Sequence, residues 1–296
     1  AMGRGLGRVL SASGVPVVTC LAGRSARTVR LAAESGVEPL LDLAEVVRRA
    51  DWFISLVPPA SAIELAEEVA WALGETGSGL VYADCNSIAP ATARRVAGIV
   101  GAAGAAFVDV AILGQPPQPG QRPGPGTPRF YASGGMAPDF AQLRDHGIDV
   151  RVLEGEGQSA SGLKMCYAAL LKGLTALSTE LLVAAELLEL TEPLREELGS
   201  TQPVLWDVIR RQLPGMPPKA YRWVGEMEEM GKTYAEVGLP PGIFEGAASV
   251  YEMVAKTPLG REVPEDRKVG KTMEEVVGVL ADSLRAARAR AGSGAG

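Results

Sequence analysis

Short apolar segments alternate with amphipathic helical patterns over the first 155 residues. Strands rich in Val, Ile and aromatic residues are predicted at 15–22, 52–58, 79–85 and 105–113, with two shorter ones at 130–135 and 149–155. The 3.6-residue period of helices is found at 3–14, 25–36, 42–50, 61–74 and 89–104. Strands that alternate with helices form βαβ units, so we predict a Rossmann domain with a parallel sheet over residues 1–155.

After Gly157 the pattern becomes helical throughout. Residues 159–190 form one long helical pattern of Ala, Leu and Lys without proline. Further helices are predicted at 202–213, 217–238, 242–260 and 271–291. We therefore predict an all-α C-terminal domain over residues 156–296.

Charge and composition exclude several classes of function. The net charge is −6 and no run of Lys or Arg supplies a basic face, so nucleic acid is not an expected partner. No segment reaches about 18 consecutive apolar residues and the start has no signal-peptide pattern, which predicts a cytoplasmic protein without a membrane span. Three separated cysteines and one histidine predict neither a disulfide framework nor a metal site. His146 is expected to end a helix before a strand.

The first residues, AMGRGL, have the form of the end of a glycine-rich dinucleotide-binding turn. In such a turn Gly3 is the third glycine and helix 3–14 follows, so that the pyrophosphate lies at the helix N-terminus. The first strand and the first two glycines would then precede residue 1. Met2 and Gly3 are accordingly candidate cofactor-binding residues.

A second candidate cofactor segment follows the strand at 15–22. An NAD enzyme usually places an acidic residue here, on the ribose 2′-hydroxyl. This chain has Gly23, Arg24, Ser25 and Arg27, and no carboxylate. Arginine and serine can bind a 2′-phosphate through charge-assisted and hydroxyl hydrogen bonds, so the segment predicts NADP(H).

Two later strands end in candidate site residues. Val57 and Pro58 would shape the wall around the nicotinamide or ribose, or else begin the next helix. Asn86 and Ser87 would direct polar groups at a ligand, although Ser87 also suits the N-cap of the helix that Pro90 begins.

Lys164 is the candidate general acid and base. It occupies the first turns of the long helix, among Ala, Leu and Met, where partial desolvation suits a lysine to proton transfer. Lys172 is the competing lysine, about 80° away around the same helix by the 100° step per residue. The proline-rich segment 115–128 is predicted to be a surface loop, or a rim over a pocket at the end of the preceding strand.

These motifs together resemble the β-hydroxyacid dehydrogenases, the family of 3-hydroxyisobutyrate and 6-phosphogluconate dehydrogenases. AMGRGL, AGRSART, LVPP, DCNSIAP, VDVAILG, FYASGG and GLKMCYAA occur in the order of that family's motifs. The C-terminal half, with PPKAYRWVGEMEEM, is similar to a little-characterised branch with an unassigned C-terminal domain. The resemblance implies hydride transfer in an interdomain cleft, and a homodimer through the 159–190 helix.

The same resemblance implies a substrate site. Asp109, Ile112, Leu113 and Gly114 match the family's substrate loop, and Ser87 its serine segment. Leu113 replaces the family's serine, and Tyr167 and Ala168 replace its two asparagines, so Tyr167 becomes a substitute hydrogen-bond donor. Because of these departures, the resemblance does not identify the substrate.

We therefore expect an NADP(H)-dependent oxidoreductase that acts on a carbonyl or alcohol carbon of a small acidic substrate, with Lys164 and Tyr167 as catalytic residues. An imine-reductase-like enzyme is the alternative: Lys164 argues against it, whereas Tyr167 and the apolar Leu113 are compatible with it. A non-catalytic NADP(H)-binding protein is a third hypothesis, based on the shortened glycine motif.

Overall fold

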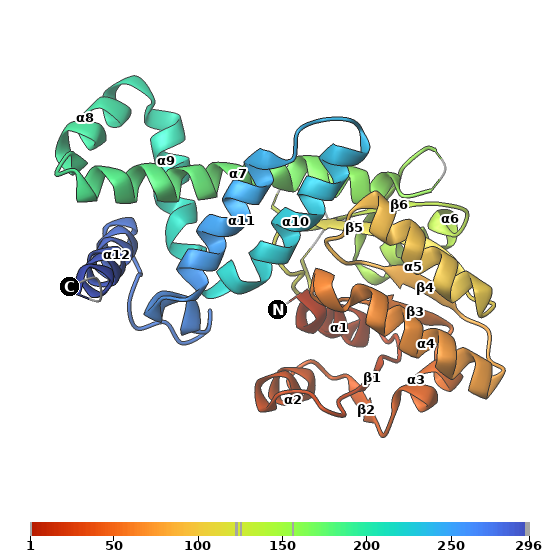
Figure 1. Ribbon diagram of the computed structural model, residues 1–296. Helices are drawn as coiled ribbons and strands as arrows, with labels where there is room; N and C mark the ends of the chain where they lie inside the picture. The colour runs from red at the N-terminus through yellow and green to blue at the C-terminus, as the bar shows by residue number, and fades with distance from the viewer. Residues whose placement is uncertain (1, 122–123, 125, 156, 294–296) are drawn as a thin grey trace. The chain divides into compact units, whose positions relative to one another are not determined.

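The computed structural model describes residues 2–121, 124, 126–155 and 157–293 (Figure 1). Its contacts divide the chain into two compact units, residues 1–165 and 166–296. The division falls inside one long helix, ten residues after the boundary predicted at 155, because the first turns of that helix pack with the first unit.

The first unit is an α/β domain, as predicted. Its helices are α1 (Met2–Ala12), α2 (Ala26–Ala33), α3 (Leu43–Arg49), α4 (Ala62–Thr76), α5 (Pro90–Ala102) and α6 (Ala137–Phe140), with the 3-10 segments η1 (Pro59–Ser61) and η2 (Ala141–His146). Its strands are β1 (Val18–Cys20), β2 (Glu38–Leu40), β3 (Trp52–Ser55), β4 (Val81–Asp84), β5 (Ala106–Leu113), β6 (Arg129–Ser133) and β7 (Asp149–Val152).

The strands form two separate sheets. The pair β1-β2 is parallel, and the five-stranded sheet has the order β3-β4-β5-β6-β7. All neighbours in the larger sheet are parallel except β5 and β6, which are antiparallel. The parallel prediction is therefore confirmed for most of the sheet, and fails where the loop after β5 is a hairpin rather than a helical crossover.

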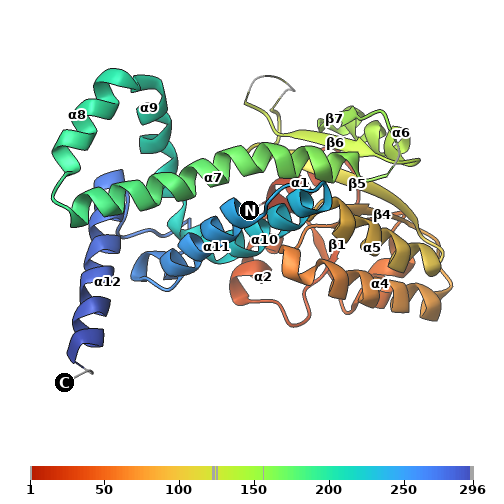
Figure 2. The same ribbon diagram turned by 45° about the horizontal axis from the view of Figure 1, so that its top comes forward.

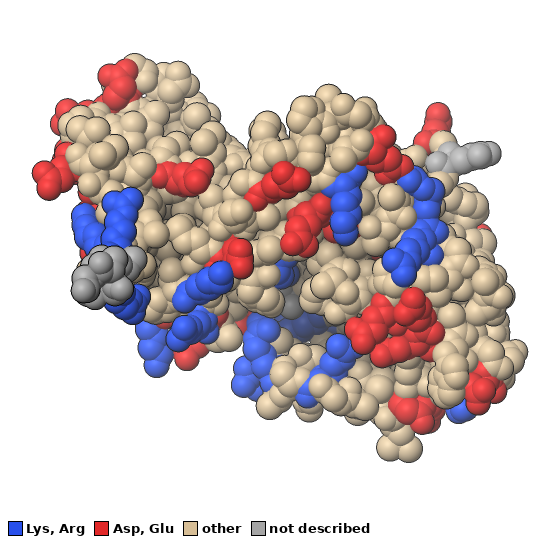
Figure 3. Space-filling view, in the orientation of Figure 1, with Lys and Arg blue, Asp and Glu red and all other residues tan. Residues whose placement is uncertain are grey.

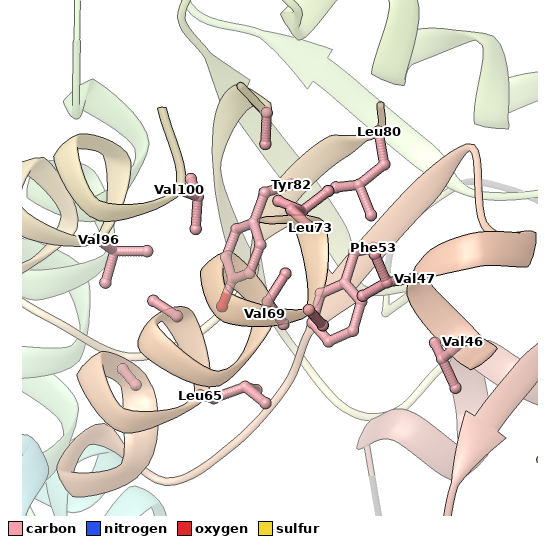
Figure 4. Close-up of a cluster of buried hydrophobic side chains, with 14 of the residues drawn as sticks. Val46, Val47, Phe53, Leu65, Val69, Leu73, Leu80, Tyr82, Val96 and Val100 are labelled. Atoms are coloured by element: carbon pink, nitrogen blue, oxygen red, sulfur yellow. The ribbon is translucent and has the colours of Figure 1, made fainter. Parts of the chain in front are cut away.

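Two hydrophobic clusters cover opposite faces of the larger sheet. Phe53 and Tyr82 stack at 5.3 Å between ring centroids and pack with α3, α4 and α5 (Figures 2 and 4). Trp52 and Ala83, their neighbours in sequence, instead join the cluster that contains residues of α1 and α6. This alternation follows from the two-residue period of a strand, and it leaves the strand ends for polar residues.

The second unit is helical. Besides the later part of α7 (Ser159–Leu187), it contains α8 (Thr191–Thr201), α9 (Pro203–Gln212), α10 (Ala220–Glu236), α11 (Gly242–Ala255) and α12 (Met273–Ser293), with the 3-10 segments η3 (Leu213–Gly215), η4 (Pro217–Lys219) and η5 (Pro258–Arg261). Its described residues form no strand, only an isolated bridge between Val263 and Asp266. The predicted all-α character is confirmed.

Two elements were missed by the sequence pattern. β2 is three residues long, largely exposed and contains Pro39, so it lacks an apolar run. α8 buries no residue and therefore has no apolar stripe.

Figure 3 shows acidic side chains over α8 and basic ones on α12, and the charges of the visible face are mixed in sign.

The helix α7 is also notable for its composition. Among the described helices it is long and apolar enough to cross a membrane, a property that core helices of soluble proteins share. It carries both lysines singled out above, Lys164 and Lys172.

Candidate functional site

Lys164 is buried near the start of α7, with 8 % of its surface exposed. Its Nζ donates a hydrogen bond to the main-chain oxygen of Asn86 at 2.9 Å. Asn86 follows β4 by two residues, so the lysine lies at the carboxyl end of the parallel strands. That edge is where open α/β sheets bind ligands.

The side chain of Asn86 ties two strand ends together. Its Oδ1 accepts from the Val57 N–H at 2.7 Å, and its Nδ2 donates to Ser55 Oγ at 2.8 Å and to Asp84 Oδ2 at 3.0 Å. The amide is thus used within the protein, where it helps to hold the carbonyl that receives Lys164. The predicted contact of Asn86 with the cofactor stays a prediction.

Asp84, the last residue of β4, is a buried carboxyl beside this lysine. Its Oδ1 also accepts from the Asn86 N–H at 2.9 Å. The pKa of Asp84 is raised to about 7, chiefly by burial and also by the negative charge of Asp109, while hydrogen bonds from Asn86 and the charge of Lys164 oppose the rise. The group therefore titrates near neutral pH.

Asp109 lies in the middle of β5 and is fully buried. It accepts from the Ser161 N–H at 2.8 Å and from Ser161 Oγ at 2.6 Å, in the first turn of α7. Burial raises the pKa of Asp109, and the hydrogen bonds from Ser161 oppose this. A carboxylate at a helix N-terminus is favourable, so Asp109 fixes the start of α7. Asp109 has no exposed surface in this structure, and its predicted place in the substrate site stays a prediction.

Ser133 completes the junction between sheet and helix. Its Oγ accepts from the Ala160 N–H at 3.0 Å and lies 3.2 Å from Asp109 Oδ2 and 3.0 Å from the Gly157 oxygen. Ser55, Ser133 and Ser161 are not among the residues that the sequence predicted for the site. The position of a serine after an apolar strand or in a first helical turn was the available signal.

The other predicted substrate residues are dispersed along the end of β5. Ile112 is in a hydrophobic cluster, Leu113 is half-buried as the last strand residue, and Gly114 is exposed with φ +120°. Residues 109–113 are strand rather than loop. Ser87 is half-buried and does not cap α5, whose N-cap is Ala89 without a side-chain hydrogen bond.

Tyr167 lies three residues beyond Lys164 in α7 and is 50 % exposed. It belongs to the second unit, whereas Lys164, Asn86, Asp84 and Asp109 all belong to the first. The structure therefore groups Lys164 with the strand ends and leaves the role of Tyr167 a prediction.

The N-terminus of α1 leaves open space around Gly3. Gly3 is exposed, with open space where a side chain would stand. Further along, a Cβ on Gly7 would approach Val37 Cγ2 to 2.7 Å, so this helix face packs as closely as dinucleotide-binding helices require. Met2 is half-buried at the first helical position. The N–H groups of a first helical turn suit an anionic group.

The segment after β1 is a tight turn. Gly23 has φ +69°, the Arg24 N–H donates to the Leu21 oxygen at 3.1 Å, and the Arg24 side chain is exposed. Ser25 Oγ caps α2 by accepting from the Thr28 N–H at 3.3 Å. The serine hydroxyl is therefore engaged in a helix cap.

Arg27 and Pro58 complete the predicted cofactor residues. Arg27 is half-buried in the first turn of α2. Pro58 is exposed and extended, with φ −59° and ψ 150°, and precedes η1 and α4. The observed role of the Val57-Pro58 pair is thus to end β3 and start a helix, since Val57 itself is held by Asn86.

Lys172 has a different environment, in the second unit. It pairs with Glu226, its Nζ lies 5.4 Å from the centroid of the Trp223 ring, and its main-chain oxygen accepts from Tyr251 Oη at 2.5 Å. Burial lowers the pKa of Lys172, and Glu226 raises it. Lys172, the competing lysine, is therefore a structural ion-pair residue.

The proline-rich segment borders a small depression lined by Pro117, Gln118, Gln121, Thr127, Pro128, Phe130, Gly147, Ile148 and Asp149. Residues 122, 123 and 125 of this predicted loop lie outside the described residues. His146 ends η2 and is followed by Gly147 with φ +84°, which confirms its predicted place before a strand.

Comparisons with known proteins agree with an NAD-binding domain followed by a helical C-terminal domain. Residues 1–123 match the NAD binding domain of 6-phosphogluconate dehydrogenase, and residues 185–254 match a domain of unknown function (DUF1932). An uncharacterized 28.5 kDa protein in the 7S RNA 5′ region of Methanothermus fervidus is 30 % identical over 241 residues, which are 81 % of this chain and 90 % of that protein.

Solved structures extend the likeness. The conserved protein MTH1747 of unknown function, described as similar to 3-hydroxyacid dehydrogenases, has 30 % identity and a TM-score of 0.60 over 85 % of this chain and 92 % of its own. Mycobacterium tuberculosis 3-hydroxyisobutyrate dehydrogenase has 18 % identity and a TM-score of 0.65 over 96 % of both chains, which shows a shared fold. The chain belongs to the 6-phosphogluconate dehydrogenase-like family of β-hydroxyacid dehydrogenases, in the branch whose C-terminal domain has no assigned function.

Proposed function

We propose that this protein is an NADP(H)-dependent oxidoreductase that interconverts a carbonyl and an alcohol in a small acidic substrate, with Lys164 as general acid and base. The observation that carries the proposal is the buried Lys164 amine, held by the Asn86 carbonyl at the carboxyl ends of β3 and β4. A lysine held in this way keeps its amine at a fixed position, as proton transfer to a bound substrate requires.

The surrounding groups support proton transfer. Asp84 and Asp109 are both buried near Lys164, and the positive charge of Lys164 opposes the rise that burial causes in the pKa of each carboxyl. In the reducing direction Lys164 Nζ donates a proton to the substrate oxygen, and in the oxidising direction it accepts that proton. Asn86 is a positioning residue in this scheme, because it acts through its contact with the lysine.

The first unit supplies the cofactor residues. When bound, the nicotinamide supplies or accepts the hydride. Met2 and Gly3 at the start of α1 would hold the pyrophosphate, and Arg24 would contact the 2′-phosphate. Because Ser25 caps α2, we assign the preference for NADP(H) mainly to the exposed guanidinium of Arg24.

The test of the catalytic assignment compares Lys164→Arg with Lys164→Met. Arginine keeps a positive charge and hydrogen-bond donors but cannot exchange a proton near neutral pH. Both variants should lower kcat by roughly 10²–10⁴ with little change in NADPH affinity. Turnover close to that of wild type in Lys164→Arg would contradict the assignment.

The test of the cofactor preference is Arg24→Ala. Loss of a charge-assisted contact should weaken NADPH binding by roughly ten- to hundredfold, which corresponds to about 1.5–3 kcal/mol. NADH affinity should stay nearly unchanged. Equal losses for both cofactors, measured by fluorescence titration, would show that Arg24 does not distinguish them.

An imine-reductase-like activity is the second candidate. It is favoured by Leu113, an apolar residue in place of the family's serine, and by the exposed phenol of Tyr167. A protonated imine requires less help from a lysine, so turnover of cyclic imines that survives Lys164→Met would favour this candidate. Absence of NADPH oxidation with every carbonyl and imine tested would instead favour a non-catalytic NADP(H)-binding protein.

We also propose a cytoplasmic homodimer that associates through α7. Leu170, Leu177 and Leu188 lie on or just beyond this helix and are 71 %, 59 % and 67 % exposed, which is unusual for leucines unless another surface covers them. Light scattering of wild type and of Leu177→Glu tests this proposal, with a monomeric wild type as the contradicting result.

A further inference from the structure

The first unit buries three charged side chains. Among its described residues, the charged side chains that are buried are Asp84, Asp109 and Lys164. Burying a charge is costly unless an opposite charge and hydrogen bonds compensate it. Two buried carboxyls and one buried amine in a single domain therefore require an explanation.

The pairing register of the sheet places the two carboxyls side by side. Asp84 of β4 is in register with Asp109 of β5. Ser55 of β3 and Ser133 of β6 continue the same row on either side. Residues in register on adjacent strands point to the same face of the sheet, with main chains about 4.8 Å apart. The four side chains are at most 1 % exposed, so they form one buried polar row across the sheet.

Lys164 is tied to each carboxyl through one intervening residue. Its Nζ donates to the Asn86 main-chain oxygen, and the N–H and Nδ2 of Asn86 donate to the two carboxyl oxygens of Asp84. On the other side, Asp109 accepts from the N–H and Oγ of Ser161. Ser161 lies three residues before Lys164 and hence on the same face of α7. These hydrogen bonds place the amine against both carboxyls.

The other titratable groups beside the carboxyls remain neutral around neutral pH. Burial raises the pKa of the Cys85 thiol and of the Tyr82 phenol, which flank Asp84 in the chain. Asp84, with a pKa of about 7, is largely ionised above that pH. Its charge and that of Lys164 attract each other, and such an attraction is mutual, so a carboxylate that the lysine stabilises also stabilises the ammonium.

We propose that Asp84 and Asp109 are positioning residues for the amine of Lys164: they fix its place through Asn86 and Ser161, and their negative charge keeps it an ammonium. The ammonium is the form that donates a proton to a substrate oxygen in the reducing direction. This benefit to catalysis rests on the proposed function, whereas the effect of the two carboxyls on the amine does not.

The amine can be observed directly, because Lys164 is the one lysine of the first unit among seven in the chain. NMR titration of the full chain with ¹³C-labelled lysine follows the Cε signal of each lysine against pH, and Lys164→Arg assigns the signal. Asp109→Asn is the principal variant. Its amide oxygen can accept from the Ser161 N–H and its NH₂ can donate to Ser161 Oγ, which leaves the start of α7 anchored.

We expect Lys164 to lose its proton at a pH lower by about one unit or more in Asp109→Asn than in wild type. Asp84→Asn is the second variant and should shift the midpoint in the same direction. Asp51→Asn changes an exposed carboxyl of the same unit and should leave the midpoint in place. The six lysines of the second unit should titrate alike in all four proteins. An unchanged Lys164 midpoint in either carboxyl variant that circular dichroism shows to be folded, or an equal shift in Asp51→Asn, would overturn the proposal.

A pH profile of activity separates this proposal from the proposed function. With a carbonyl substrate that wild type reduces, the alkaline fall of kcat in Asp109→Asn should move to lower pH by as much as the Lys164 midpoint moves, while KM for NADPH changes little. If the midpoint moves and the kcat profile does not, Lys164 is not the proton donor, so the proposed function fails and the role of the carboxyls stands. If neither moves, the role of the carboxyls is overturned.

Discussion

The buried Asp84 carboxyl should make stability depend on pH in a way that Asp84→Asn removes. Its pKa is about 7 in the folded protein, against 3.8 for an unperturbed group. Between these values the folded state keeps a proton that the unfolded state has lost, so stability falls as pH rises, and it levels off above pH 7. A difference of roughly three pKa units corresponds to about 4 kcal/mol over this range.

The substitution also has a cost that does not depend on pH. The introduced amide oxygen can still accept from the Asn86 N–H, but the introduced NH₂ group would face the Asn86 Nδ2, which is itself a donor. Two opposed donors cost about 1–3 kcal/mol and shift the whole stability curve downward. The contribution of the Asp84 proton is therefore taken from the slope of unfolding free energy against pH, and not from its absolute value. Asp109, whose pKa is also raised, is present in both proteins and contributes to both curves.

The assay is urea unfolding of wild type and Asp84→Asn in small pH steps from about pH 5 to about pH 8, across the range in which the carboxyl titrates. The difference in unfolding free energy should change by about 2–3 kcal/mol between about pH 5 and about pH 7, in favour of the variant at higher pH. Glu38→Gln is a control. Arg49 lowers the pKa of Glu38 from 4.5, so the contribution of Glu38 to the pH dependence of stability lies below pH 4.5, outside the pH range of the assay. Parallel curves for wild type and Asp84→Asn would refute the assignment of a raised pKa.

Two further predictions concern the helical unit, each with a matched control and each measured by urea unfolding. Glu226→Gln should lower the free energy of unfolding by about 3 kcal/mol, because it leaves the buried Lys172 without its charged partner. Glu252→Gln, in an exposed ion pair, should lower it by under about 1 kcal/mol. Equal losses of stability in the two variants would contradict a role for the buried pair. Gly260→Ala should lower the free energy of unfolding by at least about 2 kcal/mol, since its Cβ would lie 2.6 Å from main-chain atoms of the preceding helix. The control Gly246→Ala has open space for its Cβ and should stabilise α11 by about 0.5–1 kcal/mol. A neutral Gly260→Ala would show that the close approach relaxes at little cost.

The sequence alone determined the fold class and the order of its elements. Apolar runs and helical periods are local properties, so strands such as β4 and β5 and helices such as α7 were predicted within a few residues. Lys164 was singled out for the same local reason, a charged residue in an apolar stretch. β2 and α8 escaped because each packs without an apolar pattern of its own.

Only the tertiary structure decided what the polar residues do. Asn86 and Asp109 looked like pocket residues from their positions after or within strands, yet one ties strand ends together and the other anchors the start of α7. Lys172 resembled Lys164 in sequence and proved to be half of an ion pair with a residue 54 positions away. Hydrogen bonds and ion pairs join residues that are distant in the chain, and no local pattern encodes which partner a buried polar group will find once the backbone has folded.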